Sequence, residues 1–183
     1  MKYRTGTYVA FDGLGEADPT KSDFRYYATI QAWCKNTNIE FSLTNSHEKT
    51  YAVRDTSMRA TLYSRIRERF RYSKNMLAII TKDTRYTGSV LSYEFEQAID
   101  IYKIPIIIAY PGFSSILDVD ALSSLWPKAL TERINYMDTK AIHIAFKKEC
   151  ILDAITRFSI NGEQLSGGKV FYDRVAYAQW GLL

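Results

Sequence analysis

Two carboxylates lie close together near the middle of the chain, in the segment formed by residues 89–102. Apolar residues recur there at three- and four-residue steps, which predicts a helix with one buried face. Glu94 and Glu96 belong to its first turns and are two residues apart, so their side chains point in different directions. One of them can therefore face a cleft and take part in chemistry while the other is solvated. The alternative is that both carboxylates only favour the positive end of the helix dipole.

The elements that must position these carboxylates alternate along the chain. Short apolar or alternating runs predict five strands, at residues 7–11, 39–43, 76–80, 104–109 and 141–146. Helices are predicted at residues 24–35, 57–72, 122–134 and 148–158, and from residue 89 to a tight connection at Tyr102 and Lys103. This alternation predicts an α/β fold of the flavodoxin-like, three-layer type, with a five-stranded parallel sheet in the order 2-1-3-4-5. Residues 1–160 are expected to form that domain, and residues 161–183 an aromatic tail packed on the domain or on a partner.

Several polar and aromatic residues follow the ends of the predicted strands. Ligands of such sheets bind at the carboxyl ends of the strands, at the switch point, which this order places between strands one and three. The candidates from these strand ends are Phe11, Asp12, Asn45, Ser46 and His47. We expect Asp12, Ser46 and His47 to converge with the Glu94 carboxylate on a pocket of roughly a few hundred Å³. An imidazole such as that of His47 serves equally as a base, a ligand contact or a surface residue.

Composition and spacing argue against other kinds of site. Cys34 and Cys150 are far apart, and His47 and His143 are the only histidines, which argues against a zinc site and predicts no metal. His143 falls inside a predicted strand and is interpreted as a sheet residue. The arginine-rich helix at 57–72 is interpreted as a solvated basic face, because the net charge is only +4. The start has no apolar leader and no stretch is long enough to span a membrane, so we expect a cytoplasmic protein with reduced thiols.

Four blocks of the sequence carry a resemblance to a known family. They are residues 8–13 (YVAFDG), the segment 46–57, residues 66–74, and residues 92–98 (SYEFEQA) with the IPII that follows at 104–107. Taken in this order, they resemble the bacterial TIR-like family, which includes the TIR subunit of the Thoeris antiphage defence system. In enzymatic members a glutamate early in the third helix is catalytic, within an aromatic-Glu-Ile-Glu-like motif. The matching residue here is Glu94, with Tyr93 before it and Phe95 in place of the aliphatic residue.

The resemblance implies an enzyme that cleaves the nicotinamide–ribose bond of NAD and makes an ADP-ribose-derived signal, favoured here as cyclic, in antiphage defence. Glu94 would stabilise an oxocarbenium-like transition state. Phe11 and Tyr93 would pack on a ring of the substrate, and the polar candidates at the strand ends would bind ribose hydroxyls or phosphates. NAD is then a substrate and no cofactor is implied. A separate effector protein would sense the product, neither nucleic acid nor membrane is expected as a partner, and homo-oligomerisation is left open.

Two other function classes remain open on the sequence alone. The first is a TIR-type interaction module that works through protein contacts without turnover. The second is a phosphoacceptor receiver-like domain, which has the same strand order. A receiver needs several acidic residues after strand one and an aspartate at the end of strand three. Here strand one offers only Asp12, and Asp83 is displaced from the end of strand three, so the receiver is the weaker alternative.

Overall fold

A parallel sheet forms the centre of the molecule in a computed structural model that describes residues 4–15, 23–36, 43–45 and 57–183. Within these residues six strands pair in the order β2-β1-β3-β4-β5-β6, and all pairs are parallel. The strands are β1 (Gly6–Phe11), β2 (Leu43–Asn45), β3 (Ser73–Ile79), β4 (Ile106–Tyr110), β5 (Ala141–Ala145) and β6 (Val170–Phe171). β1 lies between β2 and β3, so the chain leaves β1 toward one edge of the sheet and then returns past it to the other side. This reversal creates the switch point beside β1.

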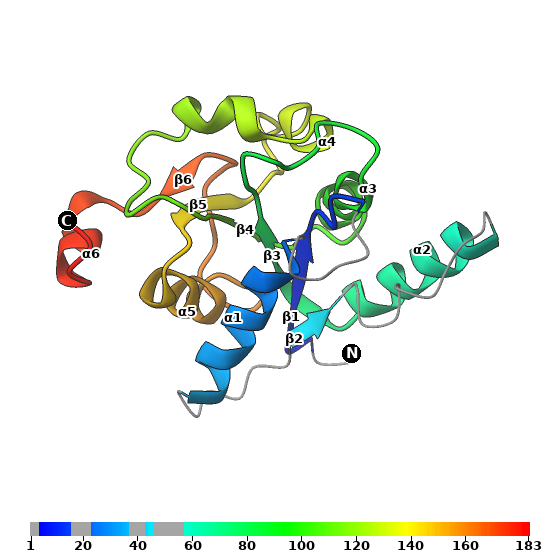
Figure 1. The fold of residues 1–183 in the computed structure, drawn as a ribbon, viewed down its shortest axis with the longest axis horizontal. Coiled ribbons are helices and arrows are strands. Elements are labelled where there is room, and N and C mark those ends of the chain that lie inside the picture. Colours follow the sequence, from blue (N-terminus) through cyan, green and yellow to red (C-terminus); the bar gives the residue numbers. More distant parts are fainter. Residues whose placement is uncertain (1–3, 16–22, 37–42, 46–56) are drawn as a thin grey trace.

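Helices cover both faces of this sheet (Figure 1). They are α1 (Phe24–Asn36), α2 (Ser57–Phe70), α3 (Val90–Glu96), α4 (Lys128–Thr131), α5 (Lys148–Arg157) and α6 (Arg174–Gln179). Helices α1 and α5 lie on one face, and α2, α3 and α4 on the other. In the described part of the chain, no helix is both long and apolar enough to cross a membrane.

Alternation along β1 sends its side chains to these two helical layers. Phe11 packs against the rings of Phe24 and Tyr27 on α1. Tyr8 has the opposite parity and stacks on Phe70 of α2, with ring centroids 4.1 Å apart. Every residue of β1 is buried, as expected for a central strand of a parallel sheet that is covered on both sides.

The prediction of a single parallel sheet is confirmed, with corrections to individual strands. β2 begins at the last residue of the predicted range 39–43, and residues 39–42 lie outside the described part of the chain. β4 begins at Ile106 rather than at 104, because Pro105 has no N–H to donate to a neighbouring strand. β3 begins three residues earlier than predicted and β6 was not predicted at all.

Two predicted helices are interrupted. The helix that carries Glu94 is α-helical only over α3 and continues as a π-helical segment, η2 (Gln97–Ile101). It ends at the predicted connection, where Lys103 adopts a left-handed backbone with φ of +48°. The helix predicted at 122–134 is wrong as a single element: it is a 3-10 segment, η3 (Asp120–Leu125), followed by α4. Pro127 separates the two, because its ring cannot continue a helix.

The C-terminal segment packs on the domain within this single chain. Val170 pairs with Ile142 of β5 and extends the sheet. Tyr177 on α6 is fully buried, and its hydroxyl accepts a hydrogen bond from the backbone N–H of Ala145. The rings of Tyr172 and Trp180 meet edge to face, with centroids 4.9 Å apart. The aromatic residues of this segment thus extend the core past residue 160.

Candidate active site

Glu94 lies on the inner side of α3, against the central strand β1. Its side chain is fully buried, at 0% exposure. The hydroxyl of Tyr8, itself completely buried, donates a hydrogen bond to Glu94 Oε1 over 2.5 Å. A buried carboxyl group is costly unless its oxygens are hydrogen-bonded. Tyr8 therefore both stabilises the carboxylate and fixes its direction.

The helix that carries Glu94 begins without a side-chain cap. Ser89 occupies the N-cap position in an extended conformation but makes no capping hydrogen bond. The hydroxyls of Ser89 and Ser92 are both buried and have no hydrogen-bond partner among the described residues. Glu96, two residues after Glu94, is only half-buried. The two carboxylates thus have different environments, as the helical spacing predicts.

The two aromatic candidates pack within the protein. Tyr93 stacks on Tyr63 of α2 with ring centroids 3.8 Å apart. Phe11 is buried, at 1% exposure, in the layer between the sheet and α1. Since Tyr8 and Glu94 lie on the other face of β1, Phe11 and Glu94 are separated by the sheet. The predicted contact of Phe11 and Tyr93 with a substrate ring stays a prediction.

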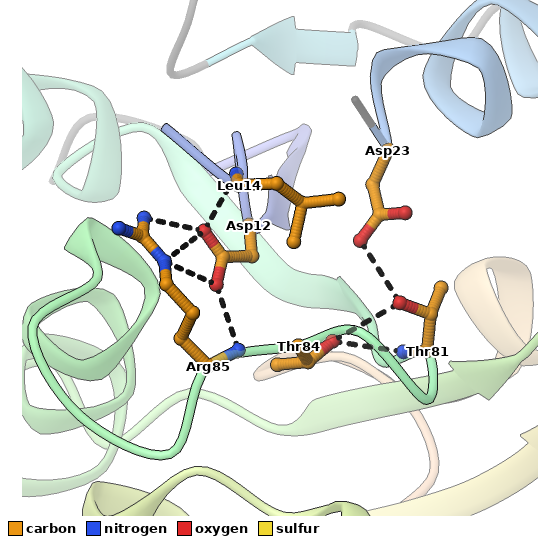
Figure 2. A network of polar contacts seen from close by, with 6 residues as sticks. All are labelled: Asp12, Leu14, Asp23, Thr81, Thr84 and Arg85. Atoms are coloured by element: carbon orange, nitrogen blue, oxygen red, sulfur yellow. Dashed lines mark hydrogen bonds and ion pairs between the residues drawn. The ribbon is translucent and has the colours of Figure 1, made fainter. Parts of the chain in front are cut away.

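Asp12 follows β1 directly and is joined to Arg85, in the loop between β3 and α3 (Figure 2). Arg85 Nη2 lies 2.7 Å from Asp12 Oδ1, and Arg85 Nε lies 3.0 Å from Oδ2. The backbone N–H groups of Arg85 and Leu14 each donate to the carboxylate over 2.9 Å. Burial pushes the pKa of Asp12 upward, but these donors outweigh it and leave the pKa below its ordinary value. The carboxylate therefore stays ionised.

A second buried carboxylate, that of Asp23, lies at the start of α1 (Figure 2). Thr81, just after β3, donates its hydroxyl to Asp23 Oδ2 over 3.3 Å. Burial raises the pKa of Asp23 to about 6, the Thr81 hydroxyl opposes that rise, and the charge of Asp12 adds to it. Asp12 and Asp23 thus lie near the same carboxyl ends of β1 and β3, and among the described residues an arginine ion pair is formed by Asp12 but not by Asp23.

The remaining predicted contacts can be placed only in part. Asn45 is the last residue of β2, and its Cα pairs with that of Val9 in β1, so its backbone lies beside the switch point. Ser46 and His47 lie outside the described residues. Two cavities lined by described residues are elsewhere: one of about 370 Å³ around Tyr172, and one of about 650 Å³ around Met137. The convergence of Asp12, Ser46, His47 and Glu94 on one pocket therefore stays a prediction.

His143 has a structural role in β5. Its ring is fully buried, with Nδ1 2.7 Å from the Tyr110 hydroxyl and Nε2 3.0 Å from the carbonyl oxygen of Gly168. A carbonyl only accepts, so Nε2 carries the proton and Nδ1 accepts from Tyr110. Burial lowers the pKa of His143 to about 4. The interpretation of His143 as a sheet residue is confirmed. Among the described residues, no three His, Cys, Asp or Glu side chains group as a metal site would require.

Three residues of this region were not predicted from the sequence: Tyr8, Asp23 and Arg85. Side chains alternate between the two faces along β1, and Tyr8 falls on the face that α3 covers. The sequence can therefore place Tyr8 on that face once the helical layers are known. Arg85 lies in a polar loop after a strand end, where functional residues often occur. Asp23 precedes a helix and reads as an ordinary N-cap residue. Its burial against Thr81 is a tertiary contact without a local signal.

A family comparison covers the part of the chain that carries Tyr8, Asp12, Arg85 and Glu94. The model of the family described as Thoeris protein ThsB, TIR-like domain, matches residues 8–115. This range is more than half of the chain and includes Tyr8, Arg85 and Glu94. The chain belongs to this family. Membership of the ThsB TIR-like family implies a part in Thoeris antiphage defence, and with it a partner protein within that system.

A solved structure supports the fold. The crystal structure of a conserved protein from Enterococcus faecalis V583 is similar with a TM-score of 0.50 and 16% sequence identity. The similarity covers 82% of this chain and 98% of the other. At this identity the comparison supports only the α/β architecture, whereas the ThsB TIR-like assignment rests on the family match.

Proposed function

We propose that this ThsB-type TIR-like chain cleaves the nicotinamide–ribose bond of NAD, with Glu94 as the catalytic residue. The observation that carries the proposal is the position of Glu94, a fully buried carboxylate that α3 presents to Tyr8 of β1. It lies within the matched family range. The ADP-ribose part would become the signal, cyclic in the form we favour, and a separate effector protein of the defence system would sense it.

This reaction can be carried by a single carboxylate. Nicotinamide is a pyridinium in NAD and leaves as a neutral molecule, so no general acid has to protonate it. The transition state resembles an oxocarbenium ion, as in glycoside cleavage. A fixed negative charge in a water-excluded site stabilises the positive charge that develops at C1′ more strongly than it would in water. The Tyr8 hydroxyl keeps one carboxylate oxygen of Glu94 in place.

The burial of Glu94 has a consequence for substrate entry. Because the carboxylate is fully covered, NAD must displace what covers it before C1′ can approach. The energy of that displacement would come from contacts with the rest of the dinucleotide, as remote binding energy is commonly used in enzymes.

The proposal is tested by comparing Glu94→Gln with Glu96→Gln. Glutamine keeps the size of the side chain and removes its charge, so Glu94→Gln should lower NAD turnover by about 10²- to 10³-fold, the effect of losing one preorganised electrostatic group. Glu96 lies on the same helix but is half-buried, and its substitution should leave turnover within about twofold. Mass spectrometry of NAD incubations, with and without lysate of phage-infected cells, identifies the product.

The outcomes separate the enzyme from the interaction module. Loss of turnover in Glu94→Gln alone, with both variants still folded by circular dichroism, supports the enzyme. Equal turnover by wild type and Glu94→Gln would remove Glu94 from the mechanism. Absence of turnover by wild type in every condition, including infected lysate, would favour a module that acts only through protein contacts.

A further inference from the structure

Arg85 is held at the switch point of the sheet, and its side chain is only partly buried. Its side chain is 43% exposed, whereas that of its partner Asp12 is completely buried. The Nε and Nη2 groups donate to Asp12, and Nη1 makes no hydrogen bond with the described residues. An arginine fixed on one edge and open on the other has donors in a set direction, which is the geometry that binds phosphate groups.

Most of the hydrogen-bonding capacity of Asp12 is used within the protein. Its two oxygens receive donors from the Arg85 side chain, the Arg85 backbone and the Leu14 backbone. A carboxylate with this many protein donors is poorly placed to accept further bonds from ribose hydroxyls. Its action is to hold Arg85, which makes it a positioning residue.

The loop that carries Arg85 is fixed on its other side too. The next residue, Tyr86, accepts a hydrogen bond at its carbonyl oxygen from the backbone N–H of Lys128 at the start of α4, over 2.9 Å. The same loop runs directly into α3 and Glu94. Arg85 therefore lies at the edge of the sheet where ligands of such folds bind, in a loop bonded to both Asp12 and α4, nine positions before the proposed catalytic residue.

We propose that Arg85 binds the diphosphate of the dinucleotide substrate, and that Asp12 positions Arg85 for this contact. The proposal rests on the proposed NAD chemistry for its ligand, and it assigns the recognition of the anionic part of that ligand to one side chain. Burial of Asp12 keeps the pair together, and its bonds raise the pKa of Arg85. The arginine therefore stays charged throughout the working pH range.

Binding of ADP-ribose, measured by calorimetry without turnover, tests the assignment. Arg85→Gln should weaken ADP-ribose binding by about tenfold or more, the effect of losing a charge-assisted hydrogen bond. Arg85→Lys keeps the charge but loses the planar fork, and should recover only part of the affinity. Asp12→Asn keeps the arginine but removes the charge that holds it, so a smaller loss of ADP-ribose affinity is expected. The salt dependence of ADP-ribose binding should be reduced in Arg85→Gln, which a purely structural role would not cause.

A double variant serves as a control that separates loss of ADP-ribose binding from loss of folding. Arg85→Gln alone leaves the buried Asp12 carboxylate without its partner, whereas Asp12→Asn with Arg85→Gln replaces the ion pair by two neutral amides. If this double variant is folded and binds ADP-ribose as tightly as wild type, the proposal is overturned. Absence of ADP-ribose binding by wild type at millimolar concentration overturns it as well.

Turnover measurements keep this proposal separate from the proposed function. Binding of ADP-ribose through Arg85 without NAD turnover would support the anion site and contradict the enzyme. NAD turnover with a KM unchanged in Arg85→Gln would support the enzyme and contradict the anion site.

Discussion

Replacing Asp23 by asparagine is expected to stabilise the protein at neutral pH. Asp23 is only 2% exposed, and burial raises the pKa of its carboxyl group from 3.8 to about 6. The Thr81 hydroxyl donates to it and partly offsets this effect. Above about pH 6 the folded protein therefore holds a negative charge in a site that disfavours it, beside the like charge of Asp12.

The sign and size follow from proton linkage. Between pH 3.8 and about 6 the folded state retains a proton on Asp23 that the unfolded state has released, so this group's contribution to stability falls as the pH rises through that window. Each unit of pKa corresponds to about 1.4 kcal/mol. The rise in the pKa of Asp23 from 3.8 to about 6 therefore lowers the free energy of unfolding by about 3 kcal/mol at neutral pH. Asparagine carries no charge and keeps an oxygen that can accept from Thr81. We expect Asp23→Asn to gain about 1–3 kcal/mol near neutral pH and almost nothing near pH 4.

Urea unfolding of both proteins over a range of pH measures this difference directly. The quantity to follow is the difference between variant and wild type, because contributions from other groups cancel in it. Asp83→Asn is the matched control: Asp83 is an exposed carboxylate of the same region, and its removal should change stability by less than about 0.5 kcal/mol. If Asp23→Asn is no more stable than wild type near neutral pH, or gains equally near pH 4, the linkage argument is refuted.

Three further predictions concern the frame around the site. Asn75→Ala should cost about 2–4 kcal/mol in urea unfolding, because the Asn75 amide donates to the carbonyl oxygens of Ile155 and Phe158, which would lose their donor. His143 should remain neutral at pH 5 in an NMR titration, since burial lowers its pKa to about 4; its contribution to stability is present above the ordinary value of 6.5 and is lost as the pH falls toward 4. Ser89→Ala should leave the thermal midpoint unchanged or slightly raised, because this buried hydroxyl makes no capping bond; a loss of about 1 kcal/mol, typical of a working N-cap, would contradict it.

The fold was predictable from the sequence where it depends on local signals. These are the periodicity of apolar residues and the residue types that begin and end helices and strands. Buried runs such as the one that became β4 are typical of a parallel sheet, and the family resemblance pointed to the same architecture. Predicted helix and strand boundaries were wrong where a tertiary contact or a single residue decides where the element begins or ends. Pro105 delays β4, Pro127 divides the predicted helix at 122–134, and β6 has only two residues, too few for a periodic pattern.

The candidate site was predictable in position but not in its internal contacts. The rule for strand ends in open α/β sheets placed Asp12 near the switch point, and Asp12 lies there. The same rule could not identify its partner, because Arg85 is 73 residues away along the chain. Likewise, the helical spacing separated Glu94 from Glu96, but the bond from Tyr8 joins residues 86 positions apart. Side-chain pairing over such distances depends on the packed structure and has no local signal.

The segment that carries Glu94 has an ion pair on each side of it along the chain. Beyond the π-helical turn, Asp100 pairs with Arg133, where both groups retain contact with solvent. Ahead of α3, Arg85 pairs with a completely buried Asp12. Removal of Arg85 would leave the buried Asp12 carboxylate without its charged partner. The Glu94 carboxylate itself is held toward β1 by the hydroxyl of Tyr8. In this arrangement the Asp12–Arg85 pair connects the carboxyl end of β1 to the loop that leads into α3.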